Sequence, residues 1–368
     1  MAEALPVGRL AAMAEVPGAF DDLAGLEHPL LLVDLDDEAG GDKAGSEEVG
    51  RAVASQALAG ALSGLPAVVV GTRSRRPDPA PGPPWADVLV DRDDPALERI
   101  ESTVRTSPRA AVSLALLLRG ALSRTLDEGL AAESAVYSML QAGPEFAGWR
   151  AAHPLRPRSG DEGEAIRVHR QGDVLHVTLA RPSVHNAFDT RMRDELYEAL
   201  NLAVAEPALR VVLDGEGPSF CAGGDLEEFG SRPDPATAHL VRLERHVGRL
   251  LARLGPRVDV FVHGVCLGSG VELPAFAGRV VARPDAVFGL PEIGLGLVPG
   301  AGGTVSLPRR IGRHRTALLA LSGDRIDARR ALDWGLVDEV AAAEGGDTDP
   351  VSPSNGPHRG DFSAPPRS

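Results

Sequence analysis

The chain has 368 residues, of which 43 % are apolar, and it carries 38 basic against 52 acidic side chains. This length supports one or two domains, and the formal charge of −14 leaves no overall positive field to attract nucleic acid or an anionic membrane. Two cysteines are too few for a disulfide framework, and neither a leader pattern nor an apolar run of membrane length is present, so we expect a cytoplasmic protein without a membrane partner.

Residues 1–100 predict a small α/β segment. Apolar runs at 30–33 and 66–70 are typical of buried strands, and a helical pattern lies between them. An acidic, glycine-rich stretch at 36–50 and a proline-rich stretch at 73–84 are expected to form long loops.

A helical region follows at 101–153. Leu114, Leu118 and Leu122 recur at helical spacing, so we predict one apolar stripe that is buried against the rest of the protein. A second helical run follows this stripe. The polar stretch at 154–163 is interpreted as a linker.

The region 164–345 alternates predicted strands and helices, which assigns it to the α/β class. A β-hairpin is predicted around residues 171–173, a helix begins after Asp189, and one further helix covers 236–254. Residues 346–368 are rich in Gly, Pro, Ser and Asp without apolar periodicity, and we expect them to be disordered.

Two glycine-rich loops, at 220–226 and 263–273, each follow a predicted strand and precede a predicted helix. Glycines allow close backbone approach, and a helix start presents unpaired N–H groups to whatever lies in front. One such loop is more often a tight turn than a site. Together with a third glycine-rich stretch at 288–304, which carries a Pro-Glu pair, they form a specific combination. Cys221 and Cys266 lie inside the loops and are interpreted as buried packing residues.

Over residues 166–340 this combination resembles the crotonase superfamily, the enoyl-CoA hydratase and isomerase family of acyl-CoA enzymes. The resemblance rests on motifs at 181–187, 220–225, 268–273, 291–304, 321–326 and 335–337. It implies a crotonase (ClpP-like) fold of repeated ββα units and an acyl-CoA thioester substrate. It also implies no cofactor apart from the CoA of that substrate, no metal site, and assembly as a homotrimer or homohexamer.

The resemblance assigns roles to individual residues. The backbone N–H groups of Gly224 and Ser269 would bind the thioester oxygen, although the family usually has Gly where this chain has Ser269. Glu272 and Glu292 match the two glutamates of the hydratases. Further substrate contacts are expected from Ala187, Ala222, Gly223, Asp225, Leu226, Gly268, Pro291 and Gly300.

Adding water across a 2-enoyl thioester requires a base near Cβ, a proton donor near Cα and stabilisation of negative charge on the carbonyl oxygen. Two carboxyl groups and two N–H donors supply all three, so hydration to a 3-hydroxyacyl-CoA is the first hypothesis. The alternatives within the family are enoyl-CoA isomerisation, decarboxylation, thioester hydrolysis and cofactor-free oxygenation of an aryl-acetyl-CoA. A non-catalytic acyl-CoA-binding subunit is the alternative from another class.

The chain departs from the family in the order of its parts. Family members carry helices after the core that cover the active site and help to build the trimer, whereas here residues 101–153 resemble those helices and precede the core. Residues 1–100 then resemble a shortened, degenerate crotonase half without the two loops and glutamates. A duplication with deletions or a rearranged single unit would explain this order, and an unrelated helical extension is the alternative. Arg181, Arg191 and Arg232 are candidates for binding the CoA phosphates.

Overall fold

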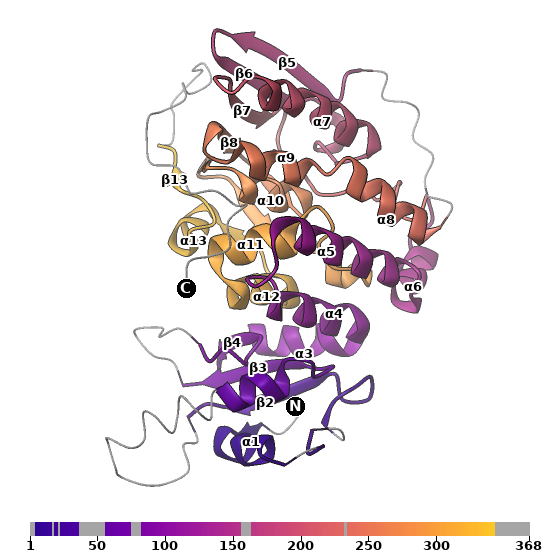
Figure 1. The fold of residues 1–368 in the computed structure, drawn as a ribbon, viewed down its shortest axis with the longest axis vertical. Helices are drawn as coiled ribbons and strands as arrows, with labels where there is room; N and C mark the ends of the chain where they lie inside the picture. Colours follow the sequence, from indigo (N-terminus) through magenta and orange to yellow (C-terminus); the bar gives the residue numbers. More distant parts are fainter. Residues whose placement is uncertain are drawn as a thin grey trace.

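The computed structural model describes residues 4–16, 18–20, 23–36, 56–74, 82–155, 163–231 and 234–342. The strands in these ranges form three sheets, and helices pack between and around them (Figure 1). The predicted loops at 36–50 and 73–84, the linker at 154–163 and the tail at 346–368 lie wholly or mostly outside the described residues. No helix within the described ranges is both long and apolar enough to cross a bilayer.

The N-terminal sheet is parallel throughout, with the strand order β1-β2-β3-β4. Its strands are β1 (Leu5–Pro6), β2 (Leu30–Asp34), β3 (Val68–Arg73) and β4 (Val88–Asp91), accompanied by α1 (Val7–Ala14) and a helix at 56–62. Leu10, Leu58, Leu62 and Trp85 belong to a small core of its own. The strands predicted at 30–33 and 66–70 are therefore present, the second beginning two residues later.

A helical layer connects this sheet to the larger part of the molecule (Figure 1). It consists of α3 (Ala96–Thr106), α4 (Pro108–Arg119), α5 (Leu126–Gln141) and α6 (Pro144–Ala152). The predicted apolar stripe is buried at Leu114 and Leu118, but Leu122 is 38 % exposed, so that part of the prediction is wrong. The reason is that α4 ends at Arg119, which leaves Leu122 in the turn before α5 instead of on the helical face.

The larger part contains a six-stranded sheet of order β13-β10-β8-β7-β6-β5 and a three-stranded sheet of order β12-β11-β9. β5 and β6 form the predicted antiparallel hairpin, and the other neighbours in the six-stranded sheet are parallel. The strands are β5 (Ile166–Gln171), β6 (Val174–Leu179), β7 (Arg210–Gly215), β8 (Val258–Val262), β9 (Val265–Leu267), β10 (Arg279–Ala282), β11 (Val287–Gly289), β12 (Ile326–Asp327) and β13 (Glu339–Val340).

Helices cover these sheets and connect their strands. They are α7 (Thr190–Ala205), α8 (Pro235–Glu244), α9 (Val247–Leu254), α10 (Ser269–Glu272), α11 (Gly303–Ile311), α12 (Arg313–Ser322) and α13 (Ala328–Trp334), with short 3-10 turns η2 (Pro182–Val184), η3 (Gly255–Arg257), η4 (Pro274–Phe276) and η5 (Glu292–Leu295). α7 begins after Asp189 as predicted, and the Asp189 carboxylate caps it by accepting the Met192 N–H at 2.7 Å.

The single helix predicted over 236–254 is wrong, because the chain bends at Arg245 and His246. α8 lies along α5, whereas α9 packs against α7, so one straight helix could not make both contacts. The bend leaves the side chains of α8 beside a cavity described below.

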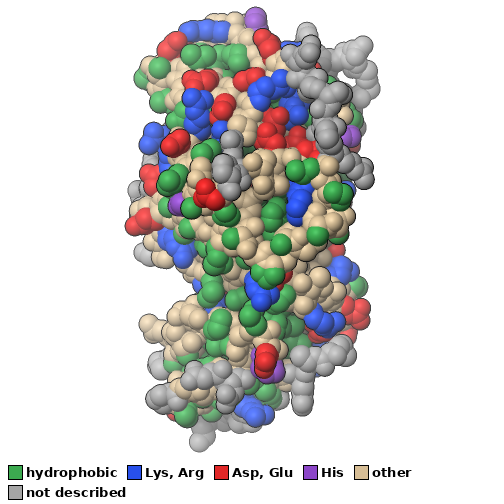
Figure 2. All heavy atoms as spheres, turned by 90° about the vertical axis from the view of Figure 1, so that its right-hand side faces the viewer, with side chains coloured by type: hydrophobic (Ala, Val, Ile, Leu, Met, Phe, Trp, Pro, Cys, Tyr) green, Lys and Arg blue, Asp and Glu red, His purple; other side chains and the backbone are tan. Residues whose placement is uncertain are grey.

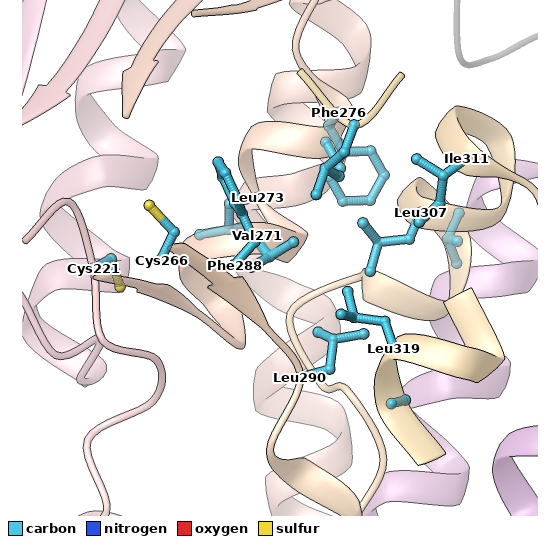
Figure 3. Packing of buried hydrophobic residues seen from close by; sticks show 14 of the residues in the cluster. Cys221, Cys266, Val271, Leu273, Phe276, Phe288, Leu290, Leu307, Ile311 and Leu319 are labelled. Carbon is cyan, nitrogen blue, oxygen red and sulfur yellow. The ribbon is translucent and has the colours of Figure 1, made fainter. Parts of the chain in front are cut away.

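One hydrophobic core runs through the helical layer and the larger part without interruption. It includes Leu114 and Leu130 from the helical layer together with residues of α10 to α12. Figure 3 shows Phe276 beside Leu307 and Ile311 within it, and Cys221 and Cys266 belong to the same cluster. Both cysteines are free and buried, which confirms the packing interpretation. The helical layer therefore shares its core with the region of the glycine-rich loops, and Figure 2 shows a narrower waist toward the N-terminal sheet.

A buried ion pair holds the N-terminal sheet to the helical layer. Arg119 donates to both oxygens of Asp87, from Nε at 2.9 Å and from Nη2 at 2.7 Å, and Asp87 Oδ2 also accepts the Val69 N–H at 2.8 Å. From α12, Arg313 Nη1 lies 3.6 Å from Asp87, and His314 contacts the Ala86 carbonyl at 2.9 Å. β3, α4 and α12 therefore meet at the Asp87 carboxylate.

Replacing Asp87 with alanine should destabilise the protein by about 3–5 kcal/mol, because the largely buried Arg119 guanidinium loses its counter-ion. Urea unfolding measures this change. Asp324→Ala is the matched control, since its pair with Arg99 is exposed and its loss should cost less than about 1 kcal/mol. Equal effects of the two substitutions would contradict this account of the junction.

Candidate active site

The two glycine-rich loops lie side by side. Cys221 and Cys266 pair as a parallel bridge, in which the Cys221 N–H donates to Val265 O at 3.2 Å and the Leu267 N–H donates to Cys221 O at 3.0 Å. Gly223 has a φ of 102°, and a Cβ atom there would lie 3.2 Å from Leu267 O. Glycine at this position therefore permits both the backbone conformation and the close approach of the loops.

Gly224 and Ser269, the two predicted backbone donors, meet at one cavity. Both residues line it, and no acceptor in the described part of the chain pairs with either N–H. Ser269 is the first residue of α10, where N–H groups lack acceptors within the helix. Its hydroxyl lies 3.5 Å from Cys221 Sγ, so the serine side chain is accommodated among buried atoms. Two donors are thus available for a carbonyl oxygen.

Glu272 lines the same cavity, and two backbone amides fix its carboxylate. Its Oε2 accepts the Ala301 N–H at 2.7 Å and the Gly303 N–H at 2.8 Å. A Cβ atom on Gly303 would lie 2.7 Å from Glu272 Cγ, so a larger residue would push the loop away from the carboxylate. Among the described residues none donates a hydrogen bond to the other oxygen, Oε1, so it is available to a ligand or a water molecule.

Glu292 also lines the cavity, at the start of η5. It lies against Gly268, where φ is 50° and where a Cβ atom would collide with Glu292 Oε1. Glu292 Oε2 is buried and has no hydrogen-bond partner among the described residues. This carboxyl group is therefore held by close packing and retains one oxygen for a proton.

The structure separates the remaining predicted substrate contacts into two groups. Asp225 and Gly300 line the cavity with the four residues above. The other predicted residues, Ala187, Ala222, Gly223, Leu226, Gly268 and Pro291, do not line it. Among them, Gly223 and Gly268 serve the packing of the loops.

The three arginines suggested for binding the CoA phosphates differ in their surroundings. Arg181 is buried, and its guanidinium lies 2.8 Å from Asp189 and 3.4 Å from Asp225, so its charge is already balanced inside the protein. Arg191 pairs with Glu195 along α7 at 3.9 Å. Arg232 lies outside the described residues.

Comparisons with known proteins show the family of this chain. The sequence model of the enoyl-CoA hydratase/isomerase family matches residues 169–346. The 2,3-dehydroadipyl-CoA hydratase of Escherichia coli is 39 % identical over 174 residues, which cover 47 % of this chain and 68 % of that protein. The chain belongs to the enoyl-CoA hydratase/isomerase family.

Other relatives differ in the reaction that their names state. The 1,2-epoxyphenylacetyl-CoA isomerase of Escherichia coli is 36 % identical over 186 residues, which cover 49 % of this chain and 71 % of that protein. The crystal structure of enoyl-CoA hydratase from Thermoplasma volcanium GSS1 is 35 % identical and has a TM-score of 0.45, covering 49 % of this chain and 73 % of that one. The family includes acyl-CoA enzymes of more than one reaction type.

In this enoyl-CoA hydratase/isomerase family member, a third buried carboxylate comes from outside the matched region. Glu133 of α5 accepts the Gly302 N–H at 2.7 Å through Oε1, and the Thr304 N–H at 2.8 Å and hydroxyl at 2.7 Å through Oε2. The successive N–H groups of residues 301–304 therefore alternate between Glu272 and Glu133. The N-terminal helical layer thus positions the loop that positions Glu272.

Sequence reasoning did not single out Glu133. A signal was nevertheless present, because Glu133 falls between Leu130 and Tyr137 at helical spacing on an otherwise apolar face. A carboxylate in such a stripe requires buried donors. Its partners are 169 or more residues away in the sequence and are recognised only after α5 is placed against α11.

The three carboxyl groups share a buried environment without an ion pair to any described basic side chain. Burial raises the pKa of Glu292 to about 8 and the pKa of Glu133 to about 7. Burial, together with the charges of Glu292 and Glu133, raises the pKa of Glu272 well above its usual range. Like charges this close cannot all ionise at low cost, so the cluster keeps at least one proton at neutral pH.

These shifts predict how stability depends on pH. Because the pKa of Glu292 rises from 4.5 to about 8 on folding, the folded protein holds a proton that the unfolded chain has released. The free energy of unfolding should therefore fall as pH rises from about 4.5 to about 8. Glu292→Gln should make the free energy of unfolding depend less steeply on pH in this range. Urea unfolding at a series of pH values measures it.

Glu128→Gln is the control for this experiment, because hydrogen bonds from Thr125 lower the pKa of the exposed Glu128 and its titration lies below this range. It should leave the slope unchanged. A slope that persists in Glu292→Gln would show that Glu292 does not titrate in this range.

Proposed function

We propose that this protein hydrates a 2-enoyl-CoA thioester to a 3-hydroxyacyl-CoA. The observation that supports this most directly is that Glu272 and Glu292 line the same cavity as Gly224 and Ser269, whose backbone N–H groups have no acceptor among the described residues. Hydration needs two proton-handling groups and one oxyanion site, and this set supplies them. CoA enters as part of the substrate, and the proposed chemistry requires no further cofactor.

The two amides would act on the thioester oxygen. As water adds to Cβ, negative charge develops on that oxygen, and donors already aimed at it are stabilising without reorganisation. Each such donor is worth roughly 3 kcal/mol in the transition state. The Gly224 and Ser269 N–H groups are free to play this part because no described acceptor competes for them.

The two glutamates would divide the proton transfers between them. Glu272 is anchored through Oε2, so Oε1 can orient a water molecule and accept its proton while the water oxygen bonds to Cβ. Glu292 would donate a proton to Cα. The buried cluster keeps at least one proton at neutral pH, and the two backbone amides that donate to Glu272 favour Glu272 as the member that is ionised. After product release, Glu272 gives its proton to solvent and Glu292 takes up a proton from solvent. This exchange restores the starting state.

Glu292→Gln and Glu272→Gln should each lower kcat for hydration by about 10²–10⁴-fold, because each removes one proton transfer from the transition state. Affinity for an unreactive saturated acyl-CoA should change little in either variant. Hydration is followed by loss of the enoyl thioester absorbance for 2-enoyl-CoAs of several chain lengths. Isomerisation of a 3-enoyl-CoA without hydration of any 2-enoyl-CoA would replace the proposal by isomerase activity.

Glu133 is proposed as a positioning residue in this mechanism. In Glu133→Gln an amide NH₂ must face N–H groups of the 302–304 loop, so the loop shifts and Glu272 is misplaced. We expect kcat to fall roughly 10–100-fold. The alkaline limb of the pH profile should move to lower pH, because one negative charge next to Glu272 and Glu292 is removed.

Glu145→Gln provides a matched control for this variant. Glu145 of α6 accepts the Arg109 and Ala110 N–H groups at 2.8 and 3.0 Å, so it binds a helix start in the same way but lies outside the cavity lining. It should lower stability without moving the pH profile. Equal pH profiles for wild type and Glu133→Gln would reduce Glu133 to a structural role.

A further inference from the structure

One arginine on the cavity wall forms no ion pair with another described residue. Arg193 lies 2.7 Å from Asp194, and Arg245 lies 3.1 Å from Glu198, so these two cavity-lining cations are neutralised. Arg242 of α8 lines the same cavity, yet it forms no ion pair with any acid in the described ranges. Its charge is therefore available to a ligand.

Contacts with α5 hold the Arg242 guanidinium in one orientation. Nε donates to Ser134 Oγ at 3.1 Å, Nη2 donates to Ser138 Oγ, and Cζ lies 4.6 Å from the centre of the Tyr137 ring. Nη1 has no partner among the described residues. A cation fixed by hydroxyl groups and an aromatic face keeps its full charge, since none of these groups neutralises it.

Arg242 lies close to the loop at residues 300–304, called the catalytic loop below because it anchors Glu272. The Tyr137 ring on which it rests packs against Gly300, where a Cβ atom would be 2.6 Å from two ring carbons. The next residue, Ala301, donates its N–H to Glu272. One aromatic ring therefore separates the guanidinium from the loop that anchors Glu272, a separation that an acyl chain can span.

The surroundings of Arg242 favour an anionic ligand. Burial lowers the pKa of this guanidinium, which reflects the cost of removing a charge from water without an adjacent counter-ion. Glu133 on α5 attracts Arg242 through space, but the two side chains form no ion pair, and the Glu133 oxygens accept hydrogen bonds from Gly302 and Thr304 instead. A carboxylate on a bound ligand would compensate this cost and could pair with the planar guanidinium.

We propose that Arg242 binds a carboxylate on the acyl group of the substrate, so that the preferred thioesters are enoyl-CoAs derived from dicarboxylic acids. This inference rests on the proposed function in placing the thioester at Gly224 and Ser269. The CoA phosphates are the other anions of the ligand. The long pantetheine arm separates them from the thioester, whereas Arg242 lies one ring away from the catalytic loop.

The test compares binding of unreactive, saturated thioesters to the full-length protein by calorimetry. Succinyl-, glutaryl- and adipyl-CoA are matched with butanoyl-, pentanoyl- and hexanoyl-CoA. At least one dicarboxylic thioester should bind wild type roughly 10–100-fold more tightly than its methyl-ended partner, the range expected for a charge-assisted hydrogen bond. Arg242→Met should abolish this difference, and Arg242→Lys should retain part of it.

Arg245→Met is the control, because this side chain lines the same cavity but already has acidic partners, and it should leave the affinity difference unchanged. Thermal unfolding verifies that each variant is folded. The same acids are also measured as pantetheine thioesters, which lack the CoA nucleotide. An affinity difference that persists with the pantetheine thioesters supports binding of the acyl carboxylate by Arg242.

Two results would overturn the inference. The first is that wild type binds no dicarboxylic thioester more tightly than its methyl-ended partner. The second is that Arg242→Met lowers the affinity for both CoA thioesters of a pair equally and does not lower the affinity for the pantetheine thioesters. The second would assign Arg242 to a CoA phosphate. Because saturated thioesters do not react, these affinities are obtained whether or not the protein hydrates enoyl-CoA. A failure of the proposed reaction is thus distinguishable from a failure of the carboxylate site.

Discussion

The alternate binding of four successive N–H groups by two buried carboxylates is the constraint on which the rest of the site depends. Residues 301–304 give their amides in turn to Glu272 and Glu133. Neither carboxylate could be buried without these donors, and the loop could not keep its shape without the carboxylates. Catalytic geometry and local folding are therefore set by the same hydrogen bonds.

This arrangement makes the helical layer part of the site. Glu133 and Tyr137 both come from α5, one holding the loop and the other lining the cavity. The shared hydrophobic core and the Asp87–Arg119 pair at the other end join α5 to the N-terminal sheet as well. Packed elements therefore connect the N-terminal sheet with the loop that holds Glu272.

Buried groups of both charges meet around the cavity. Glu272 and Glu292 line it and belong to a carboxyl cluster that keeps a proton at neutral pH, and Arg242 lines it without an ion pair to any described residue. The aromatic ring of Tyr137 lies between them. Such a cavity suits a ligand that accepts a proton at one end and carries negative charge at the other.

The sequence by itself determined the family, the α/β class and the catalytic candidates, because glycine-rich loops and the Pro-Glu motif encode local backbone requirements that are visible within a few residues. Gly223, Gly268 and Glu272 are of this kind. Only the tertiary structure decided the bend at Arg245, the exposure of Leu122 and the contacts of Glu133 and Arg242. Each of these depends on which helix lies against which, and for Glu133 the partners are 169 or more residues away, a distance over which hydrophobic periodicity carries no information.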